Sequence, residues 1–176
     1  MINVLKKYCL DEKGLSFMET AILFPVLLTM MMAVYDLGQG VVINQKTVAA
    51  SQIIADLITR QEIVSVDSVS DIVRAGEFAF DPYPSTPFGY DIASVEFDDE
   101  ADPDVLWRIT ENMNASDQAI ESTTGLGEEG EGVVVVSVQY VYEPYFSNFV
   151  VDQFNMTERA FLRGRKSVTV TCTDCP

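Results

Sequence analysis

The segment from Leu15 to Tyr35 limits the fold of this chain more than any other feature of its sequence. Its side chains are mostly apolar, and Glu19 is its single charged residue. About 20 apolar residues are enough to span the hydrocarbon core of a bilayer as a helix, so the sequence predicts a transmembrane helix over residues 15–35. Pro25 lies inside this segment, where it should bend the helix without ending it, since membrane helices tolerate proline.

The distribution of basic residues predicts how this helix is oriented. Lys6, Lys7 and Lys13 precede the apolar segment, and the next basic residue, Lys46, lies well beyond it. The positive-inside rule therefore places the N-terminus in the cytoplasm and exports the rest of the chain. An ordinary cleaved signal peptide is the alternative, and it requires small residues after the apolar core. Residues 35–38 read Tyr-Asp-Leu-Gly, a poor site of that kind, so we expect the helix to be retained.

Glu19 requires an explanation, because an ionised side chain within a membrane helix costs roughly 2.5 to 3.5 kcal/mol on insertion scales and usually has a partner or a function. It follows Leu15 by four residues, and Leu15 follows Gly14 at the end of a short polar leader. Residues 13–19, Lys-Gly-Leu-Ser-Phe-Met-Glu, resemble a class III (type IV-like) prepilin processing site. Together with Pro25, this region is similar to the TadE/TadF-like minor pseudopilins of the Tad (tight adherence, Flp-type) pilus systems.

This resemblance implies a processing site and an assembly residue. A prepilin peptidase would cut between Gly14 and Leu15, which makes the mature chain one charge unit more negative than the full chain. The Glu19 carboxylate would then pair with the new amine of Leu15, in the same subunit or in a neighbour, during assembly. Alternatively, the Glu19 side chain reaches the headgroup region near the start of the helix and has no such partner.

The resemblance also implies partners and a location. The expected partners are the prepilin peptidase, a sister minor pseudopilin, the major Flp pilin, the inner-membrane assembly platform and membrane lipid. The expected location is the bacterial inner membrane, crossed once, with the C-terminal domain exported and available for incorporation into a pilus.

The composition excludes several other classes of function. The formal net charge of −16 argues against a nucleic-acid partner, whose phosphates would repel the chain. The sequence has no histidine, which is the most common general base, and it has neither a Gly-x-Ser-x-Gly elbow nor a Gly-rich phosphate loop. We therefore expect a protein that is not an enzyme and that needs no cofactor.

A signal-anchored extracytoplasmic binding module is the alternative function. Residues 98–104 are rich in carboxylates, which could supply oxygen ligands to Ca²⁺. This run lacks the loop glycine and the distal glutamate of an EF-hand, and Pro103 interrupts it, so a solvated acidic loop is the competing interpretation. The acidic residues are Asp98, Asp99, Glu100, Asp102 and Asp104, and the candidate metal ligands among them are Asp98, Glu100, Asp102 and Asp104.

Cys172 and Cys175 remain after removal of the leader, which carries the third cysteine, Cys9. Export places this pair where a disulfide can form, and we interpret it as a small disulfide near the end of the chain, with a reactive or unpaired dithiol as the alternative. A zinc site would be two ligands short, since the chain has no histidine and no further mature cysteine.

Periodicity predicts the elements that follow the apolar segment. Apolar pairs recur at helical spacing from Val42 to Ile58, so the long helix should continue as an amphipathic helix over residues 36–60. The pattern from Val66 to Val73 predicts a short second helix that ends near Gly76. Alternating apolar residues then predict strands over residues 90–97, 105–110, 134–142 and 167–171, the last with Cys172 on its valine face.

Strands joined without long helices between them predict an antiparallel sheet. We expect the exported part of the long helix to pack on one face of this sheet. The predicted fold is therefore α+β, a pilin-like arrangement of a long N-terminal helix packed on a small antiparallel sheet. The predicted segments are a leader (1–14), a transmembrane helix (15–35), an amphipathic helix continuing into the exported domain (36–60) and the exported α+β domain (61–176).

Two features before the last predicted strand are open to two interpretations each. Phe146, Phe149, Val150 and Phe154 have helical spacing, so this segment is either a helical cap on the core or a hydrophobic loop. The basic residues that follow either receive an acidic surface of a neighbouring subunit or pair with carboxylates of the same chain. They are Arg159, Arg163, Arg165 and Lys166.

Overall fold

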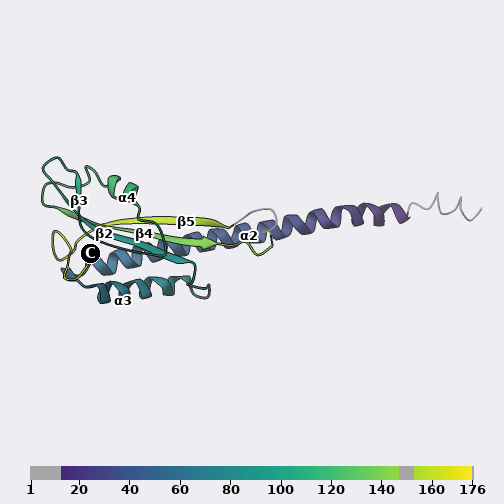
Figure 1. Ribbon diagram of the computed structural model, residues 1–176. Coiled ribbons are helices and arrows are strands. Elements are labelled where there is room, and N and C mark those ends of the chain that lie inside the picture. The colour runs from purple at the N-terminus through teal and green to yellow at the C-terminus, as the bar shows by residue number, and fades with distance from the viewer. Residues whose placement is uncertain (1–12, 147–152, 176) are drawn as a thin grey trace, which may run out of the picture.

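A single helix, α2 (Lys13–Thr59), forms the axis of the molecule. The computed structural model describes residues 13–146 and 153–175. The C-terminal half of α2 lies along a sheet, while its N-terminal half projects beyond the domain (Figure 1). The helix continues through Pro25 without interruption, so the two helical segments expected from the sequence are one element.

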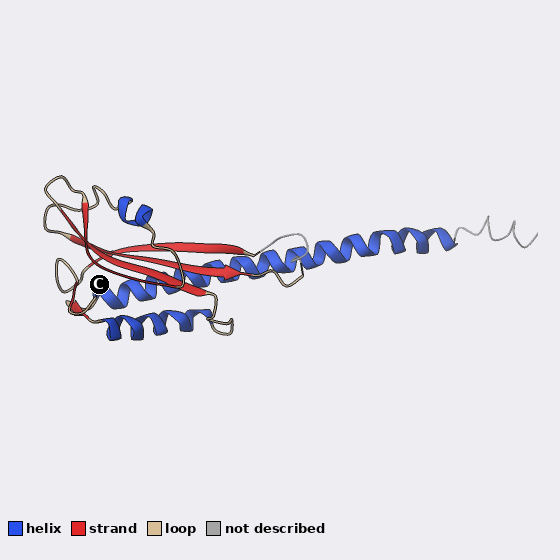
Figure 2. Cartoon of the chain, viewed as in Figure 1, coloured by secondary structure: helices blue, strands red, loops and turns tan. Residues whose placement is uncertain are grey.

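Four strands form an antiparallel sheet in the order β3-β2-β4-β5, and the sheet lies beside the long helix (Figure 2). The long helix packs on this small sheet, which confirms the predicted α+β fold. The central strand β4 is buried on both faces, which explains its consecutive valines from Val133 to Val136, because a strand covered on both sides needs no polar face. The strands are β2 (Phe88–Phe97), β3 (Pro103–Glu111), β4 (Gly132–Tyr142) and β5 (Phe154–Arg163).

The strand β5 corrects the sequence analysis, which predicted a helical cap or a hydrophobic loop up to Phe154. Phe154 instead begins the strand, and Met156 and Ala160 are the buried residues in it. From Met156 onward, burial alternates along β5. An edge strand tolerates charged and polar residues at many positions, and here Glu158 lies at an inward position while Phe161 is exposed, so the sequence itself does not alternate between apolar and polar residues. Two residues of the expected cap, Phe149 and Val150, lie outside the described residues.

The last predicted strand, residues 167–171, is also wrong. In the described chain this region contributes the short strand β6 (Thr171–Cys172), which pairs in parallel with β1 (Ile63–Val64) outside the main sheet. Val170 is buried but Val168 is exposed, so the two valines do not share a buried face. The carbonyl oxygen of Val170 accepts a hydrogen bond of 2.8 Å from the indole of Trp107.

Apolar side chains cover both faces of the sheet. On one face, α2 and α3 pack on the strands around the main core, whose members include Ile54, Ile58, Phe80, Ile92 and Val136. On the other face, the short helix α4 (Asp117–Glu121) and its neighbouring loops cover a smaller cluster. This cluster comprises Ala93, Val95, Phe97, Ala119, Ile120, Val133 and Val135.

The predicted second helix is α3 (Val66–Glu77), which lies beside α2 and is followed by the short 3₁₀ helix η1 (Phe78–Phe80). Ser65 caps its N-terminus: the Ser65 hydroxyl accepts from the Ser68 N–H at 3.2 Å. In return, the Ser68 hydroxyl accepts from the Ser65 N–H at 2.8 Å. This reciprocal pair is a capping box, which satisfies two N–H groups that a helix start otherwise leaves without partners.

Gly76 allows α3 to pack closely against α2. A Cβ atom at this position would lie 2.5 Å from Cγ1 and 2.6 Å from Cδ1 of Ile54. Ile54 is completely buried, so its side chain has little room to move aside. The contact between the two helices therefore requires glycine at this position.

We predict that Gly76→Ala lowers the free energy of unfolding by about 1–3 kcal/mol, the usual cost of adding a methyl group to a well-packed core. Denaturation of the full chain in detergent, followed through the fluorescence of buried Trp107, measures this change. Gly38→Ala is the matched control, because a Cβ atom at Gly38 meets nothing within 4 Å. The control should leave stability unchanged or raise it slightly, and equal stability of the two variants would contradict the packing argument.

Candidate functional site on the long helix

The residues assigned to processing and assembly lie in the first turns of α2. The helix begins at Lys13, so the backbone of Gly14 and Leu15 is helical; their side chains lie outside the described residues. Glu19 is exposed and follows Leu15 by one helical turn, about 6 Å along the helix axis. The Gly14–Leu15 junction and Glu19 are therefore held on one continuous helix.

The N-terminal half of α2 presents an unpacked apolar surface. The helix meets the length and composition required to cross a membrane, with a mean hydropathy of 1.9 in a stretch of which no residue is buried in the protein. An exposed apolar surface of this size marks a site that contacts a membrane or another protein. Its exposed large apolar residues are Phe17, Met18, Ile22, Leu23, Phe24, Val26, Leu27, Met30, Met31, Val34 and Tyr35.

The residue after this apolar stretch, Asp36, is buried, with only 4 % of its surface exposed. Its carboxylate accepts hydrogen bonds from the backbone N–H groups of Tyr145 at 3.1 Å and Phe146 at 3.0 Å. Its backbone carbonyl accepts a bond of 2.9 Å from the Tyr142 hydroxyl. We call these four residues the Asp36 clamp, because their bonds hold the end of β4 and the following loop against α2.

The Tyr142 hydroxyl remains a donor throughout the physiological pH range. Burial, with a smaller contribution from the nearby Asp36 carboxylate, raises the pKa of Tyr142 to about 12. Gly40, one turn after Asp36, is buried where the strands meet the helix, and a Cβ atom there would lie 3.5 Å from Met156. The clamp is thus continuous with the packing of the sheet on α2.

We predict that Asp36→Asn reduces the protection of the Tyr145 and Phe146 amides from hydrogen exchange by about tenfold. The amide has one oxygen where the carboxylate has two, so one N–H group keeps only a neutral acceptor and the other loses its acceptor; a loss of about 1.4 kcal/mol corresponds to that factor. NMR-detected exchange of the full chain in micelles would measure it. Asp56→Asn, on the same helix but bonded to Arg60, is the control and should leave both amides unchanged. Unaltered protection in Asp36→Asn would show that the carboxylate does not hold this loop.

A second buried carboxylate, Asp91, lies on β2 and faces away from α2. It accepts bonds from Arg108 Nε at 2.8 Å and Nη2 at 2.7 Å, from the Thr110 hydroxyl at 2.7 Å and from the Ser116 N–H at 2.8 Å. Arg108 also pairs with exposed Asp117 at 2.6 Å. Burial alone would raise the pKa of Asp91, but the accepted hydrogen bonds, above all from Arg108, lower it below its usual value. This network ties β2, β3 and the loop before α4 together.

We predict that Asp91→Asn costs roughly 2 kcal/mol at neutral pH, since it removes bonds to a charged acceptor. Because the pKa of Asp91 is lowered in the folded state, its contribution is complete above the unfolded pKa of about 4 and is lost as the pH falls through the folded value. Urea denaturation at neutral and acidic pH should therefore show a smaller loss of stability on acidification for Asp91→Asn than for the unmodified chain.

Asp117→Asn is the matched control, because it removes the other carboxylate that contacts Arg108. Asp117 is exposed, and such pairs contribute only about 0–1 kcal/mol. The prediction for Asp91 fails if both variants have the same stability and the same dependence on pH.

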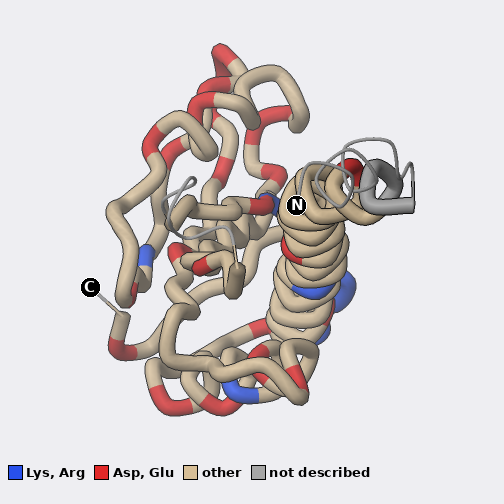
Figure 3. The backbone as a smooth tube through the Cα atoms, turned by 90° about the vertical axis from the view of Figure 1, so that its right-hand side faces the viewer, with Lys and Arg blue, Asp and Glu red and all other residues tan. Residues whose placement is uncertain are grey.

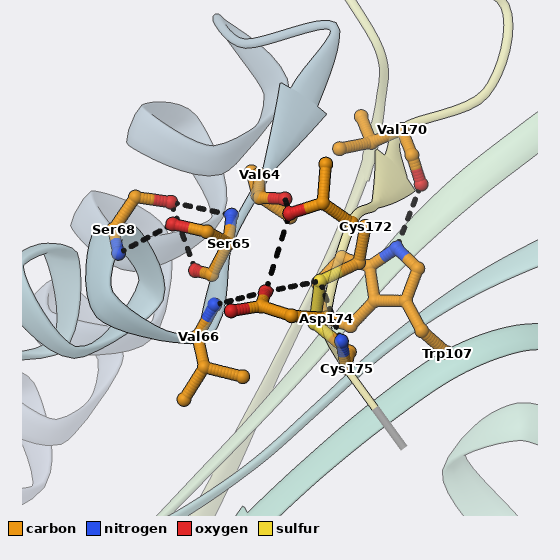
Figure 4. Close-up of a disulfide and its surroundings, with 10 residues drawn as sticks. Val64, Ser65, Val66, Ser68, Trp107, Val170, Cys172, Asp174 and Cys175 are labelled. Atoms are coloured by element: carbon orange, nitrogen blue, oxygen red, sulfur yellow. Dashed lines mark hydrogen bonds between the residues drawn. A yellow bond between two sulfur atoms is a disulfide. The ribbon is translucent and has the colours of Figure 1, made fainter.

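The two C-terminal cysteines form a disulfide, with Cα atoms 5.7 Å apart. The neighbouring Asp174 carboxylate accepts a hydrogen bond of 2.9 Å from the N–H of Val66, in the first turn of α3 (Figure 4). A negative charge at that end is also favoured by the helix dipole. Cys172, Asp174 and Cys175 bring three potential metal ligands together, but the bonded sulfurs offer no thiolate. The arrangement therefore fastens the chain end to α3.

The carboxylates of residues 98–104 do not converge on a common point. Asp98 accepts from the backbone N–H groups of Glu100 at 2.9 Å and Asp102 at 2.8 Å, and so closes the turn between β2 and β3. Within the described residues, the group at the disulfide is the only one with three acidic or cysteine ligand atoms within 4.8 Å of one another. The structure does not bring together the candidate calcium ligands Asp98, Glu100, Asp102 and Asp104.

The basic residues near the end of β5 bond mainly within the chain. Arg163 pairs with Glu131 at 3.1 Å, and Arg165 pairs with Asp56 on α2. Arg159 donates a hydrogen bond of 3.2 Å to the hydroxyl of a serine before α4. These bonds favour internal pairing over a surface that is reserved for a neighbouring subunit.

No protein family, curated protein or solved structure matches this chain. The functional conclusion therefore depends on its own residues and geometry. Sequence reasoning considered Asp36 only as part of a poor peptidase site and did not single out Asp91. An acid directly after an apolar span was a usable signal for Asp36, whereas the partners of Asp91 depend on the strand register, which the sequence does not show.

Proposed function

We propose that this chain is a minor pseudopilin of the TadE/TadF kind, a structural component without catalytic activity that helps to assemble a Tad-type (Flp) pilus. The observation that carries the proposal is the position of Glu19. It is an exposed acid on the projecting apolar half of α2, one turn after the Gly14–Leu15 junction.

Charge pairing in the membrane gives Glu19 its role. A prepilin peptidase cutting after Gly14 would leave an ammonium group on Leu15, near or within the membrane, where an unpaired charge is unfavourable. The Glu19 carboxylate can neutralise this amine in its own subunit or in a neighbour. Water does not screen the attraction in hydrocarbon, so a pair formed between subunits would fix the stagger of adjacent helices.

The shape of the molecule supports this role. The N-terminal half of α2 projects from the domain (Figure 1), so apolar helices from several subunits could pack side by side while their domains remain outside the membrane. The partners that we propose are a sister minor pseudopilin, the major Flp pilin and the inner-membrane assembly platform. The proposed orientation has the N-terminus in the cytoplasm and the domain exported.

We predict that Glu19→Gln leaves processing largely intact and strongly reduces pilus assembly, because the amide keeps the size of the side chain but removes the charge that pairs with the amine. The measurements are mass spectrometry of the N-terminus of the protein from its native host and quantification of pili on the cells. The unmodified chain and Glu19→Gln should both begin at Leu15.

Glu19→Asp is the matched control, because it keeps the charge on a shorter side chain and should retain more assembly than Glu19→Gln. Normal piliation in Glu19→Gln would contradict the role of the carboxylate. A chain that still begins at Met1 would contradict the whole proposal and favour a signal-anchored extracytoplasmic module.

A further inference from the structure

Exposed aromatic side chains gather where α2 leaves the domain. Tyr35, Tyr145, Phe146 and Phe154 each have between 43 % and 64 % of their surface exposed, and we call these four residues the aromatic rim. The rings of Tyr35 and Phe146 are 5.5 Å apart and meet edge to face. Phe154 packs in the same way on Tyr142 of the Asp36 clamp, at 5.4 Å. The rim is therefore a defined surface that includes residues of α2, of the loop after β4 and of β5.

The Asp36 clamp fixes the level of this rim along the helix axis. The carboxylate of Asp36 bonds directly to the N–H groups of Tyr145 and Phe146, and Tyr35 is the residue before it. A helix that enters the hydrocarbon at Leu15 rises about 30 Å by Tyr35, which is the thickness of the hydrocarbon core. The rim consequently lies where hydrocarbon gives way to headgroups.

We propose that the aromatic rim lies within the lipid headgroup layer on the exported face of the membrane, so that the domain rests on the bilayer. This inference rests on the membrane-spanning helix of the proposed function, but it does not depend on pilus assembly. Aromatic side chains, Tyr and Trp above all, concentrate at this level of membrane proteins, because one part of the ring is apolar and another can contact water or headgroups.

The surface next to the rim points to lipid as its occupant. A groove of about 880 Å³ runs from Met30 and Ala33, inside the apolar span, to Phe154 and Met156 on β5. One end of the groove, at Met30, lies beside the apolar span; the groove passes the rim and its other end reaches the polar side chains of Asn44 and Gln45. A lipid molecule fits this change along its length, because its chain is apolar and its headgroup is polar.

The charges are arranged so that the domain can approach lipid at this end. The acidic turn after β2 lies at the opposite end of the sheet, since β2 pairs Phe88 with Tyr140 near the rim and Glu96 with Gly132 far from it. Figure 3, viewed from the N-terminal end of α2, shows acidic positions spread over the domain and few basic ones. Within residues 142–146 the single charged residue is Glu143, which is exposed.

Tryptophan reporters in the full chain test this placement. Tyr145→Trp reports on the rim, Leu27→Trp on the middle of the span and Leu126→Trp on the end of the domain far from the membrane. Each variant is reconstituted into vesicles of phosphatidylethanolamine and phosphatidylglycerol that contain lipids with a nitroxide either near the headgroup or near the end of the acyl chain. The emission of Trp107, which is 3 % exposed, is subtracted by using the unmodified chain.

We expect the shallow nitroxide to remove roughly half of the emission added by Tyr145→Trp, as interfacial aromatic residues lie at the headgroup level. The deep nitroxide should quench Leu27→Trp most strongly, and neither lipid should affect Leu126→Trp, which aqueous acrylamide should quench.

The outcomes that overturn the proposal are distinct. If Leu27→Trp is quenched by lipid but Tyr145→Trp is quenched only by acrylamide, the domain stands clear of the membrane while the anchor holds. If Tyr145→Trp is shielded from both quenchers, protein covers the rim in place of lipid. If Leu27→Trp also escapes the deep nitroxide, the spanning helix fails, and the placement of the rim fails with it.

Discussion

The division of one helix into an exposed apolar half and a half packed on the sheet is the constraint on which the rest of the structure depends. Residues of α2 up to Tyr35 expose apolar side chains, whereas Ile43, Ala50, Ile54 and Ile58 are buried against the domain. Burial of each isoleucine contributes roughly 1.5–3 kcal/mol. The sheet is therefore stable as a unit because α2 covers one of its faces, while the projecting half of α2 stays exposed.

Burial against the domain begins at Asp36, although Leu37 and Val41 on the other side of α2 are still exposed. At that point the helix carries a buried carboxylate, Asp36, which would be costly without partners but accepts two backbone N–H groups. These N–H groups belong to the loop after β4, which is not hydrogen-bonded into the sheet. The carboxylate therefore stabilises a segment that the sheet does not hold. Asp91 does the same on the other face of the sheet, where it joins β2 to the loop before α4. Asp36 and Asp91 thus stabilise the fold by accepting hydrogen bonds from segments distant in sequence.

Much of the fold could be predicted from periodicity, and the failures have physical causes. The long helix and α3 could be predicted from helical spacing, and β2, β3 and β4 from their apolar residues, although β2 and β4 are buried along almost their whole length. The edge strand β5 buries few side chains and was not recognised, and β6 is too short for periodicity to mean anything. The strand expected at Val168 was wrong because the chain there makes separate bonds, from the Gly132 N–H to the Val168 carbonyl and from the Trp107 indole to the Val170 carbonyl, and strand β6 begins only at Thr171.

The candidate site was predictable in a different way. The Gly14–Leu15 junction and Glu19 were recognised from a local sequence pattern, and their function stays a prediction. The Asp36 clamp depends on contacts between residues more than a hundred positions apart, which only the folded structure reveals. The acidic run of residues 98–104 is the opposite case. These residues are neighbours in sequence, but their carboxylates do not converge on one point, and Asp98 closes a turn.

The continuity of α2 has a mechanical consequence. The described helix is unbroken from Lys13 to Thr59, and its C-terminal half packs on the sheet through the main core. A force applied along the projecting half of α2 would therefore be transmitted directly to the strands, and a rotation of that half would rotate the domain with it.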